Sequence, residues 1–381
     1  MGLMQGELSK NPGAGSALDS DSRGVPVVVS RLFDVEWYSK QYPDVAATGL
    51  DPLSHYMASG SKQGREPNAF FHTPFYRRQL TERGIASTNN AFLHYLTEGA
   101  ELGLRPHPLF EPSFYRECYA LSTESAVWPY EFFMTVGLQR EDNPTPLFES
   151  SYYRIRSSEL AGDGQGITLP PLLHYLANWD HQTIDPHALF DVSWYISHAR
   201  LSSSSGYDPL SDYLEYGCKA GLFPNPLFDS EWYLNEYVDV SESGVDPLTD
   251  FVLSGWSIGR FPNALFDPEW YVENNSDLRD SQMNPLTHYI HFGALERRNP
   301  GPLFDTAWYL LQVPDGEWIE NPLSHFLWKG SKKGLNPHPM FDSYFYAREN
   351  TQEVATDQVP IAHYVRCGIQ EGRKHNGLFT A

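Results

Sequence analysis

The chain has 381 residues, with 48 acidic and 27 basic side chains and a formal net charge of −21. Phosphate contacts require clustered lysine and arginine, so this charge argues against a nucleic-acid partner, and it also disfavours anionic membrane surfaces. No apolar run is long enough to span a bilayer, so we expect no membrane insertion. The aromatic share of 14% indicates a folded chain rather than a disordered one.

The three cysteines are Cys118, Cys218 and Cys367, an odd number with no CxxC spacing. This usage is typical of a reducing compartment, and the N-terminus lacks the apolar segment of a secretory signal. We therefore predict a cytoplasmic location. Residues 1–30 are rich in Gly, Ser and Asp and are predicted to be a disordered tail.

Residues 31–381 consist of tandem repeats of about 38 residues, which we number by their anchor phenylalanines. A tenth anchor, Phe379, lies close to the last residue, so the chain is either a piece of a longer protein or an array whose last Leu-Phe pair caps the stack. The nine anchors are Phe33, Phe71, Phe110, Phe148, Phe190, Phe228, Phe266, Phe304 and Phe341.

Each repeat contains the start signals of two short helices. In repeat 1, Asp34 is a good N-cap for the first helix, and Pro43 restricts its end. Asp51 and Pro52 predict the start of the second helix, and Gly60 is expected to end it in the left-handed conformation. Such short helices need neighbours for stability, so we predict an all-α fold, an α-solenoid of nine helix pairs.

A histidine near the start of the second helix recurs in six repeats. A row of histidines suggests metal ligands or a proton relay, but one ligand per repeat places neighbours about 10 Å apart, too far to share a metal. We favour a structural role, in which each ring makes a hydrogen bond to the backbone or to a neighbouring repeat. The six are His55, His94, His174, His288, His325 and His363.

A tyrosine occupies one position of the first helix in all nine repeats. Aromatic ladders can stack sugars, but recurrence in every repeat is what a packing position requires, and core packing is the favoured interpretation. These recurrent tyrosines are Tyr38, Tyr76, Tyr115, Tyr153, Tyr195, Tyr233, Tyr271, Tyr309 and Tyr346.

An arginine follows the second helix in six repeats, with Phe223 and Leu335 in its place in two others. These side chains form a candidate interaction surface for an anionic polymer, although pairing with acidic caps is the favoured interpretation and would stabilise little. The six are Arg65, Arg105, Arg140, Arg260, Arg298 and Arg373.

Repeat 4 departs from the pattern: it is longer, contains Gly162-Asp163-Gly164-Gln165-Gly166, and has Trp179 where other repeats have glycine. The glycine-rich segment fits neither a calcium loop nor a phosphate-binding loop. We expect a tolerated surface loop, with a hinge or a partner site as the alternative.

The segments LFDVEWYSKQYPDVAATGLDPLSHYMASGSKQGREPNA and LFDSEWYLNEYVDVSESGVDPLTDFVLSGWSIGRFPNA resemble a tandem repeat attached to bacterial glycosyltransferases of surface-polysaccharide assembly. The resemblance covers roughly residues 32–381. It implies a polysaccharide context but transfers no catalytic residue, because the repeats leave no room for a nucleotide-sugar-binding domain.

We therefore expect no enzyme activity, no cofactor and no metal. The first functional hypothesis is a non-catalytic scaffold that presents an interaction surface to a protein partner. The alternatives are a carbohydrate-binding module with a glycan partner, and an accessory fragment of a glycosyltransferase.

Overall fold

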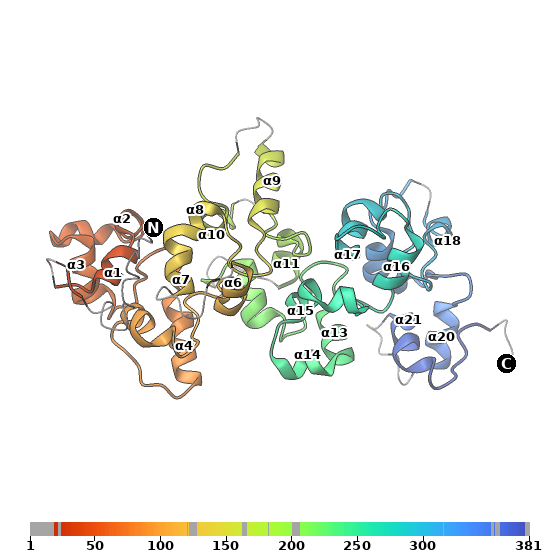
Figure 1. Ribbon diagram of the computed structural model, residues 1–381. Coiled ribbons are helices and arrows are strands. Elements are labelled where there is room, and N and C mark those ends of the chain that lie inside the picture. Colours follow the sequence, from red (N-terminus) through yellow and green to blue (C-terminus); the bar gives the residue numbers. More distant parts are fainter. Residues whose placement is uncertain are drawn as a thin grey trace, which may run out of the picture. The chain divides into compact units, whose positions relative to one another are not determined.

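The structure is a computed structural model that describes residues 19–21, 24–119, 121, 128–161, 166–181, 183–199, 206–314, 316–351, 354 and 359–377. These residues form helices and turns with a few isolated β-bridges and no strand (Figure 1). The all-α prediction is therefore confirmed. The chain divides into two compact units, Met1–Pro186 and His187–Ala381, which we call unit 1 and unit 2.

Each repeat has a first helix that begins one residue after its N-cap. In repeat 1 the side chain of Asp34 accepts a hydrogen bond from the backbone N–H of Trp37 at 2.9 Å, which satisfies one of the free donors of the first turn. The first helices are α2 (Val35–Gln41), α4 (Thr73–Glu82), α6 (Pro112–Cys118), α9 (Ser150–Ala161), α11 (Val192–Ala199), α13 (Ser230–Glu236), α16 (Pro268–Asn274), α18 (Thr306–Leu311) and α20 (Ser343–Glu349).

A second helix follows in each repeat, and in all but repeat 2 it begins with proline. Proline suits this first position because its missing N–H would have no partner there. The second helices are α3 (Pro52–His55), α5 (Ala91–His94), α7 (Pro129–Phe132), α10 (Pro171–Asn178), α12 (Pro209–Asp212), α15 (Pro247–Leu253), α17 (Pro285–His288), α19 (Pro322–His325) and α21 (Pro360–His363).

In seven repeats the second helix runs directly into a π-helical turn that ends at the recurrent glycine. The longer i→i+5 hydrogen bonds of a π-helix are uncommon and usually mark a local structural demand. The seven turns are Tyr56–Gly60, Tyr95–Gly99, Phe133–Gly137, Tyr213–Gly217, Tyr289–Gly293, Phe326–Gly330 and Tyr364–Gly368.

The prediction that the recurrent glycine ends the second helix in the left-handed conformation is wrong, as Gly60 shows. Its φ is not positive, and the chain continues in right-handed conformation through Ser61. The left-handed residue comes four positions later, at Gly64 with φ of +79°. Gly60 is required for another reason: a Cβ at this position would lie 2.2 Å from the hydroxyl oxygen of Tyr38. The same clash, at 2.0–2.3 Å, recurs at the seven other recurrent glycines.

Short helices complete the repeats. They are α8 (Leu138–Arg140), α14 (Val238–Ser243) and the 3-10 helices Pro43–Thr48, Gly255–Ile258 and Ser331–Lys333. None of the helices among the described residues combines the length and apolar character that crossing a bilayer needs.

The folded region begins earlier than predicted. Helix α1 (Val27–Leu32) includes residues 27–30, which the sequence analysis assigns to the disordered tail. Val28 and Val29 are buried, so an apolar contact outweighs the polar composition of the preceding segment. Residues 1–18 of the predicted tail lie outside the described residues.

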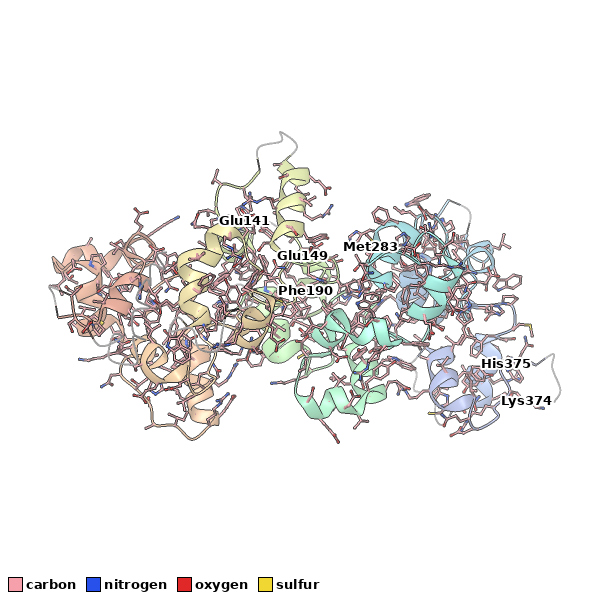
Figure 2. All side chains as sticks on the ribbon, viewed as in Figure 1. Glu141, Glu149, Phe190, Met283, Lys374 and His375 are labelled. Carbon is pink, nitrogen blue, oxygen red and sulfur yellow. The ribbon has the colours of Figure 1, made fainter. Side chains whose placement is uncertain are left out.

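Successive repeats are joined by a backbone hydrogen bond at the same place each time. The N–H of the first-helix N-cap donates to a carbonyl in the linker that leads to the next repeat, as from Asp34 to Pro67 at 3.1 Å and from Asp229 to Pro262 at 2.9 Å. Asn225 adds a second bond, from its side-chain amide to the carbonyl of Leu189, one repeat earlier. The anchor phenylalanines at the ends of the linkers are all buried, among them Phe190, which is labelled in Figure 2.

Repeat 4 differs in structure as well as in sequence. Its helices α9 and α10 are 12 and 8 residues long, and no π-helical turn follows α10. Within the predicted glycine-rich loop, residues 162–165 lie outside the described residues. The boundary between units 1 and 2 falls directly after this repeat.

Candidate functional site

The nine recurrent tyrosines lie in the interior, and none is more than 1% exposed. Each places its hydroxyl against an acceptor of the same repeat. In six repeats the hydrogen-bond partner is Nδ1 of the predicted histidine, as in the Tyr76–His94 pair at 2.6 Å and the Tyr271–His288 pair at 3.0 Å. The histidines thus bond neither backbone nor a neighbouring repeat through Nδ1, but the tyrosine of their own repeat.

The other three repeats use an aspartate as the acceptor. Tyr195 and Tyr233 donate to Asp212 and Asp250, each at 2.6 Å, and these residues stand at the histidine position. Repeat 3 has Phe132 there, and Asp142 takes over from a later position in the chain, with Tyr115 donating to it at 2.6 Å. What recurs is therefore an acceptor for the hydroxyl, not a histidine.

Burial controls the protonation of these pairs. It raises the pKa of Tyr38 to about 12, and the pKa values of the other recurrent tyrosines are raised for the same reason. Burial also lowers the pKa of His174, His288 and His325, which keeps the rings neutral. Among the described residues, no group of three or more His, Cys, Asp or Glu side chains could hold a metal ion.

Most of the six predicted arginines are engaged within their own repeat. Arg65 binds both carboxylate oxygens of Asp44, at 3.0 and 2.6 Å, and lies over the ring of Tyr42. Arg260 binds Asp250 at 2.9 Å as well as Asp239. Bidentate contact of this kind satisfies the planar guanidinium and leaves little of it to attract an external polymer.

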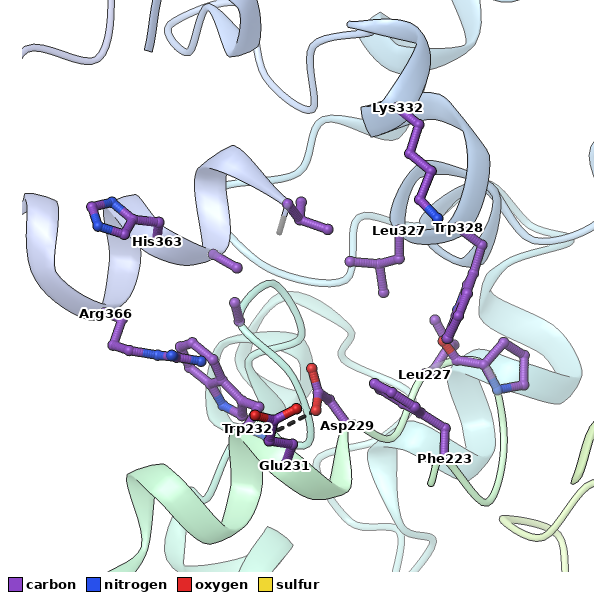
Figure 3. A pocket seen from close by; sticks show the side chains of 14 residues that line it. Phe223, Leu227, Asp229, Glu231, Trp232, Leu327, Trp328, Lys332, His363 and Arg366 are labelled. Atoms are coloured by element: carbon purple, nitrogen blue, oxygen red, sulfur yellow. Dashed lines mark hydrogen bonds between the residues drawn. The ribbon is translucent and has the colours of Figure 1, made fainter. Parts of the chain in front are cut away.

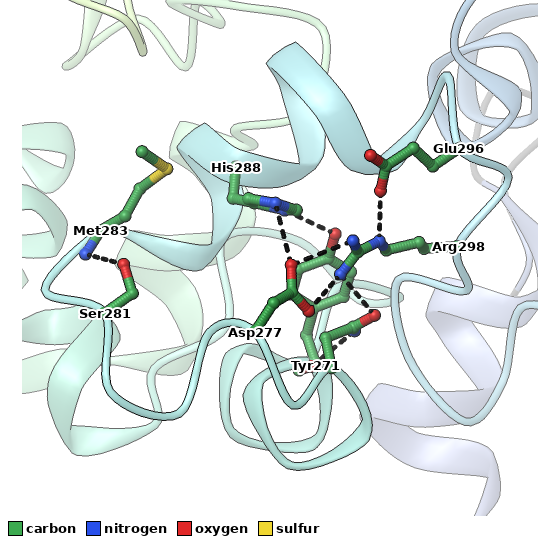
Figure 4. Close-up of polar contacts among 8 residues, drawn as sticks. Tyr271, Asp277, Ser281, Met283, His288, Glu296 and Arg298 are labelled. Atoms are coloured by element: carbon green, nitrogen blue, oxygen red, sulfur yellow. Dashed lines mark hydrogen bonds and ion pairs between the residues drawn. The ribbon is translucent and has the colours of Figure 1, made fainter.

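The arginines of repeat 7 and repeat 9 follow the same plan. Arg298 binds Asp277 at 2.8 and 3.0 Å and Glu296 at 2.6 Å, and His288 lies on the other side of Asp277 (Figure 4). Arg373 binds Glu371 and, at 2.6 Å, the side chain of Asn350.

Arg105 and Arg140 are out of register with the other four. In the eight repeats that have the recurrent glycine, the equivalent residue donates its N–H to the carbonyl of that glycine; in repeat 2 it is Leu104 and in repeat 3 it is Asp142. Likewise Leu222, not Phe223, is the equivalent in repeat 5. Arg105 instead donates to backbone carbonyls of the following linker, and Arg140 lies 3.3 Å from Asp142. The predicted six-member surface is therefore not a single ladder.

Unit 2 contains a cavity of about 290 Å³ that sequence reasoning missed. Its walls come from repeats that are distant in the chain: helix α13 and the linker before it, the π-helical turn of repeat 8, and helix α21 with the turn after it (Figure 3). The volume lies just below the range of about 300–1,000 Å³ for small-molecule sites.

Aromatic rings form one side of the cavity. Trp328 projects from repeat 8, and its Nε1 donates to the carbonyl of Pro226 at 2.8 Å. Its ring packs edge-on against Phe223 and Trp194, with centroids 5.1 and 4.7 Å away. Phe223 and Trp328 are both partly exposed and line the cavity.

Charged side chains of both signs complete the lining. Asp229 is the N-cap of α13 and Glu231 lies in its first turn, while Lys332 and Arg366 approach from repeats 8 and 9 (Figure 3). Arg366 lies over the ring of Trp232, 5.2 Å from its centroid. Within the described residues, none of these four charged groups forms an ion pair within 4.0 Å, in contrast to Arg65, Arg260 and Arg298.

Asp229 combines a structural role with this exposure to the cavity. It caps α13 by accepting from the N–H of Trp232 at 2.8 Å, and its own N–H bonds the next linker. Burial raises the pKa of Asp229 to about 6, and the negative charge of Glu231 adds to this effect. The hydrogen bond from the N–H of Trp232 and the positive charge of Arg366 act in the opposite direction. Trp232 is 4% exposed, and its indole N–H finds no acceptor in the described part of the chain.

Two of the cavity residues occupy one position of the repeat, the second residue before the recurrent glycine. Trp328 and Arg366 stand there in repeats 8 and 9, and each contacts an aromatic residue about three repeats earlier. Unlike the tyrosine and glycine positions, this position has no common chemistry. The sequence therefore contained a signal for this site, because the residue at this position varies from repeat to repeat while the rest of the repeat pattern stays constant. In repeats 1–9 they are Ala58, Thr97, Thr135, Ala177, Glu215, Leu253, His291, Trp328 and Arg366.

In comparisons with known proteins, no family model, curated protein or solved structure matches the chain.

Proposed function

We propose that the chain is a non-catalytic binding scaffold, an α-solenoid of nine repeats whose cavity in unit 2 receives a partner molecule. The observation that carries this proposal is a difference between two groups of polar side chains, those that recur in the repeats and those that line the cavity. The tyrosines, their acceptors and most of the repeat arginines are consumed by contacts inside their own repeats. Among the described residues, the charged groups around the cavity form no ion pair, although Asp229 caps a helix and Arg366 lies over the ring of Trp232.

Support for the solenoid arrangement comes from the links between repeats. The hydrogen bond from each first-helix N-cap to the next linker repeats along both units, as from Glu149 to Pro186 and from Asp191 to Pro224. Such nearest-neighbour contacts are what a one-dimensional repeat array uses for stability. The resemblance of the repeat to segments attached to bacterial glycosyltransferases supports a proposed role for the scaffold in surface-polysaccharide biosynthesis.

Catalysis is not part of the proposal, because nothing in the cavity provides a phosphate cradle or a nucleophile with an adjacent base. The purified chain should neither hydrolyse nucleotide sugars nor transfer from them. Turnover that persists in a highly purified sample and disappears on Asp229→Asn or Glu231→Gln would show that the protein is an enzyme.

Site-specific photocrosslinking in the native host tests the scaffold role. A photoreactive residue replaces Glu231 at the cavity, and a control chain carries it at Glu269, the equivalent position of repeat 7. Both side chains are exposed in the first turn of a first helix, so each variant should fold. We expect a discrete adduct from position 231 only. Equal adducts at both positions, or none at 231, would refute a binding role for the cavity.

A further inference from the structure

We infer that the cavity of unit 2 binds a neutral carbohydrate of one or two rings, a proposal that rests on the binding role proposed above. The first step is the charge of the lining. Asp229 and Glu231 face Lys332 and Arg366 across one small space, so the formal charges of the walls cancel. An anionic ligand would be repelled by two carboxylates, and a cationic ligand would be repelled by two cationic side chains. A charged ligand therefore gains no electrostatic advantage over a neutral one.

The second step is the hydrogen-bonding capacity that this lining demands. Carboxylates only accept hydrogen bonds, whereas ammonium and guanidinium groups only donate them. A hydroxyl group does both, so a polyhydroxylated ring can donate to Asp229 and Glu231 while it accepts from Lys332 and Arg366. Such bonds to ionised groups are about twice as strong as those between neutral groups.

The third step is the aromatic wall. Phe223, Leu327 and Trp328 are partly exposed and line the cavity. A pyranose has an apolar C–H face and a polar rim, which match an apolar wall next to charged groups. A peptide could use the same ring surface, but its backbone offers no groups that donate and accept at once around its whole edge.

Binding to defined sugars tests the ligand class. The intact chain is titrated with neutral hexose and N-acetylhexosamine mono- and disaccharides at millimolar concentration, followed by ligand-observed NMR. Hexuronic-acid disaccharides and a set of tetrapeptides serve as comparisons. We expect saturable binding of at least one neutral sugar, and weaker binding of the uronic acids.

Matched variants locate the binding. Glu231→Gln should weaken sugar binding about 10- to 100-fold, because a bond to a charged acceptor is lost, while Glu269→Gln should leave it unchanged. Phe223→Ala should also weaken binding, in contrast to Phe261→Ala one repeat later in the same register. Circular dichroism spectra that match the intact chain establish that each variant is folded.

The outcomes separate the ligand class from the binding role. No saturable binding of any neutral sugar, or binding that survives both Glu231→Gln and Phe223→Ala, would overturn the carbohydrate assignment. If position 231 still gives a discrete photocrosslink in the host, the scaffold proposal stands with another ligand, and selective tetrapeptide binding would identify it as a peptide. Failure of the crosslink at 231 would remove the binding role itself.

Discussion

Repeats 6 and 7 follow the same plan of 38 residues and differ in how they satisfy the buried tyrosine. In repeat 6, Tyr233 donates to Asp250, and Arg260 binds the same carboxylate. In repeat 7 the partner of Tyr271 is a neutral His288, and the arginine binds a different acid (Figure 4). The difference teaches that the fold requires a short, buried hydrogen bond here and tolerates either a charged or a neutral acceptor. A row of histidines is thus a packing feature of this fold.

The close approach of tyrosine to glycine should give the largest effect in both repeats. Adding a methyl group in Gly255→Ala or Gly293→Ala places a Cβ 2.2 or 2.0 Å from the hydroxyl of Tyr233 or Tyr271. The strain of overpacking and the broken hydrogen bond together should lower the free energy of unfolding by about 3–5 kcal/mol. Urea unfolding measures this loss.

A control distinguishes that clash from the general cost of replacing glycine. Gly244 has φ of +74° and open space around its Cβ position. Gly244→Ala should therefore cost only about 1 kcal/mol, from backbone strain alone. If the recurrent glycines tolerated alanine as well as Gly244 does, the close approach would not be the reason for their recurrence.

Removing only the hydroxyl should separate the two kinds of acceptor. Tyr233→Phe takes a hydrogen bond from a carboxylate and should cost about 2 kcal/mol, whereas Tyr271→Phe takes one from a neutral imidazole and should cost about 1 kcal/mol. Both rings stay in place, so packing is preserved. Urea midpoints of the two variants make the comparison, and a larger loss in Tyr271→Phe would contradict the ranking.

Asp229 of repeat 6 and Asp267 of repeat 7 are equivalent helix caps, but only Asp229 lines the cavity. The pKa of Asp229 is raised from 3.8 to about 6, so its ionisation opposes folding: the cost begins as the pH rises through 3.8 and is complete above about pH 6. Asparagine caps a helix as well as aspartate does. Asp229→Asn should therefore stabilise the chain by roughly 1–2 kcal/mol at pH 7, and by progressively less as the pH falls toward 4.

Thermal unfolding of Asp229→Asn across this pH range provides the measurement, with Asp267→Asn as the matched control. Glu231 and Arg366 are the charged groups that act on Asp229, so both must be retained in the variant. Stabilisation at pH 7 together with weaker sugar binding would mean that the carboxylate is kept for binding at the expense of stability. A destabilised variant at pH 7 would contradict its raised pKa.

The smallest effect is expected from exchanging the acceptors. Burial lowers the pKa of His288, so its contribution to stability is complete above about pH 6.5 and is lost as the pH falls below that value. His288→Asp recreates the arrangement of repeat 6, with Arg298 in the place of Arg260, and should reduce this acid sensitivity. Asp250→His should increase it. We expect changes of a few tenths of a kcal/mol in urea unfolding at pH 5 relative to pH 7; no difference between the two exchanges would contradict this role for His288.

The sequence by itself determined the features that recur at short range. The caps at Asp34 and Asp51, the prolines that start the second helices and the burial of the tyrosines follow from spacings within one repeat, where local hydrogen bonding and apolar periodicity act. Repetition strengthened these predictions because the same pattern occurs nine times.

Only the tertiary structure decided why Gly60 is a glycine, because its constraint comes from the hydroxyl of Tyr38, 22 residues earlier, and not from its own backbone angles. It also decided the register of the arginines, which a backbone hydrogen bond defines. The cavity could be found only in the tertiary structure, since Phe223 and Trp328 are in contact although more than 100 residues separate them in the chain. No spacing within one repeat predicts this contact, because the two residues lie almost three repeats apart in the chain.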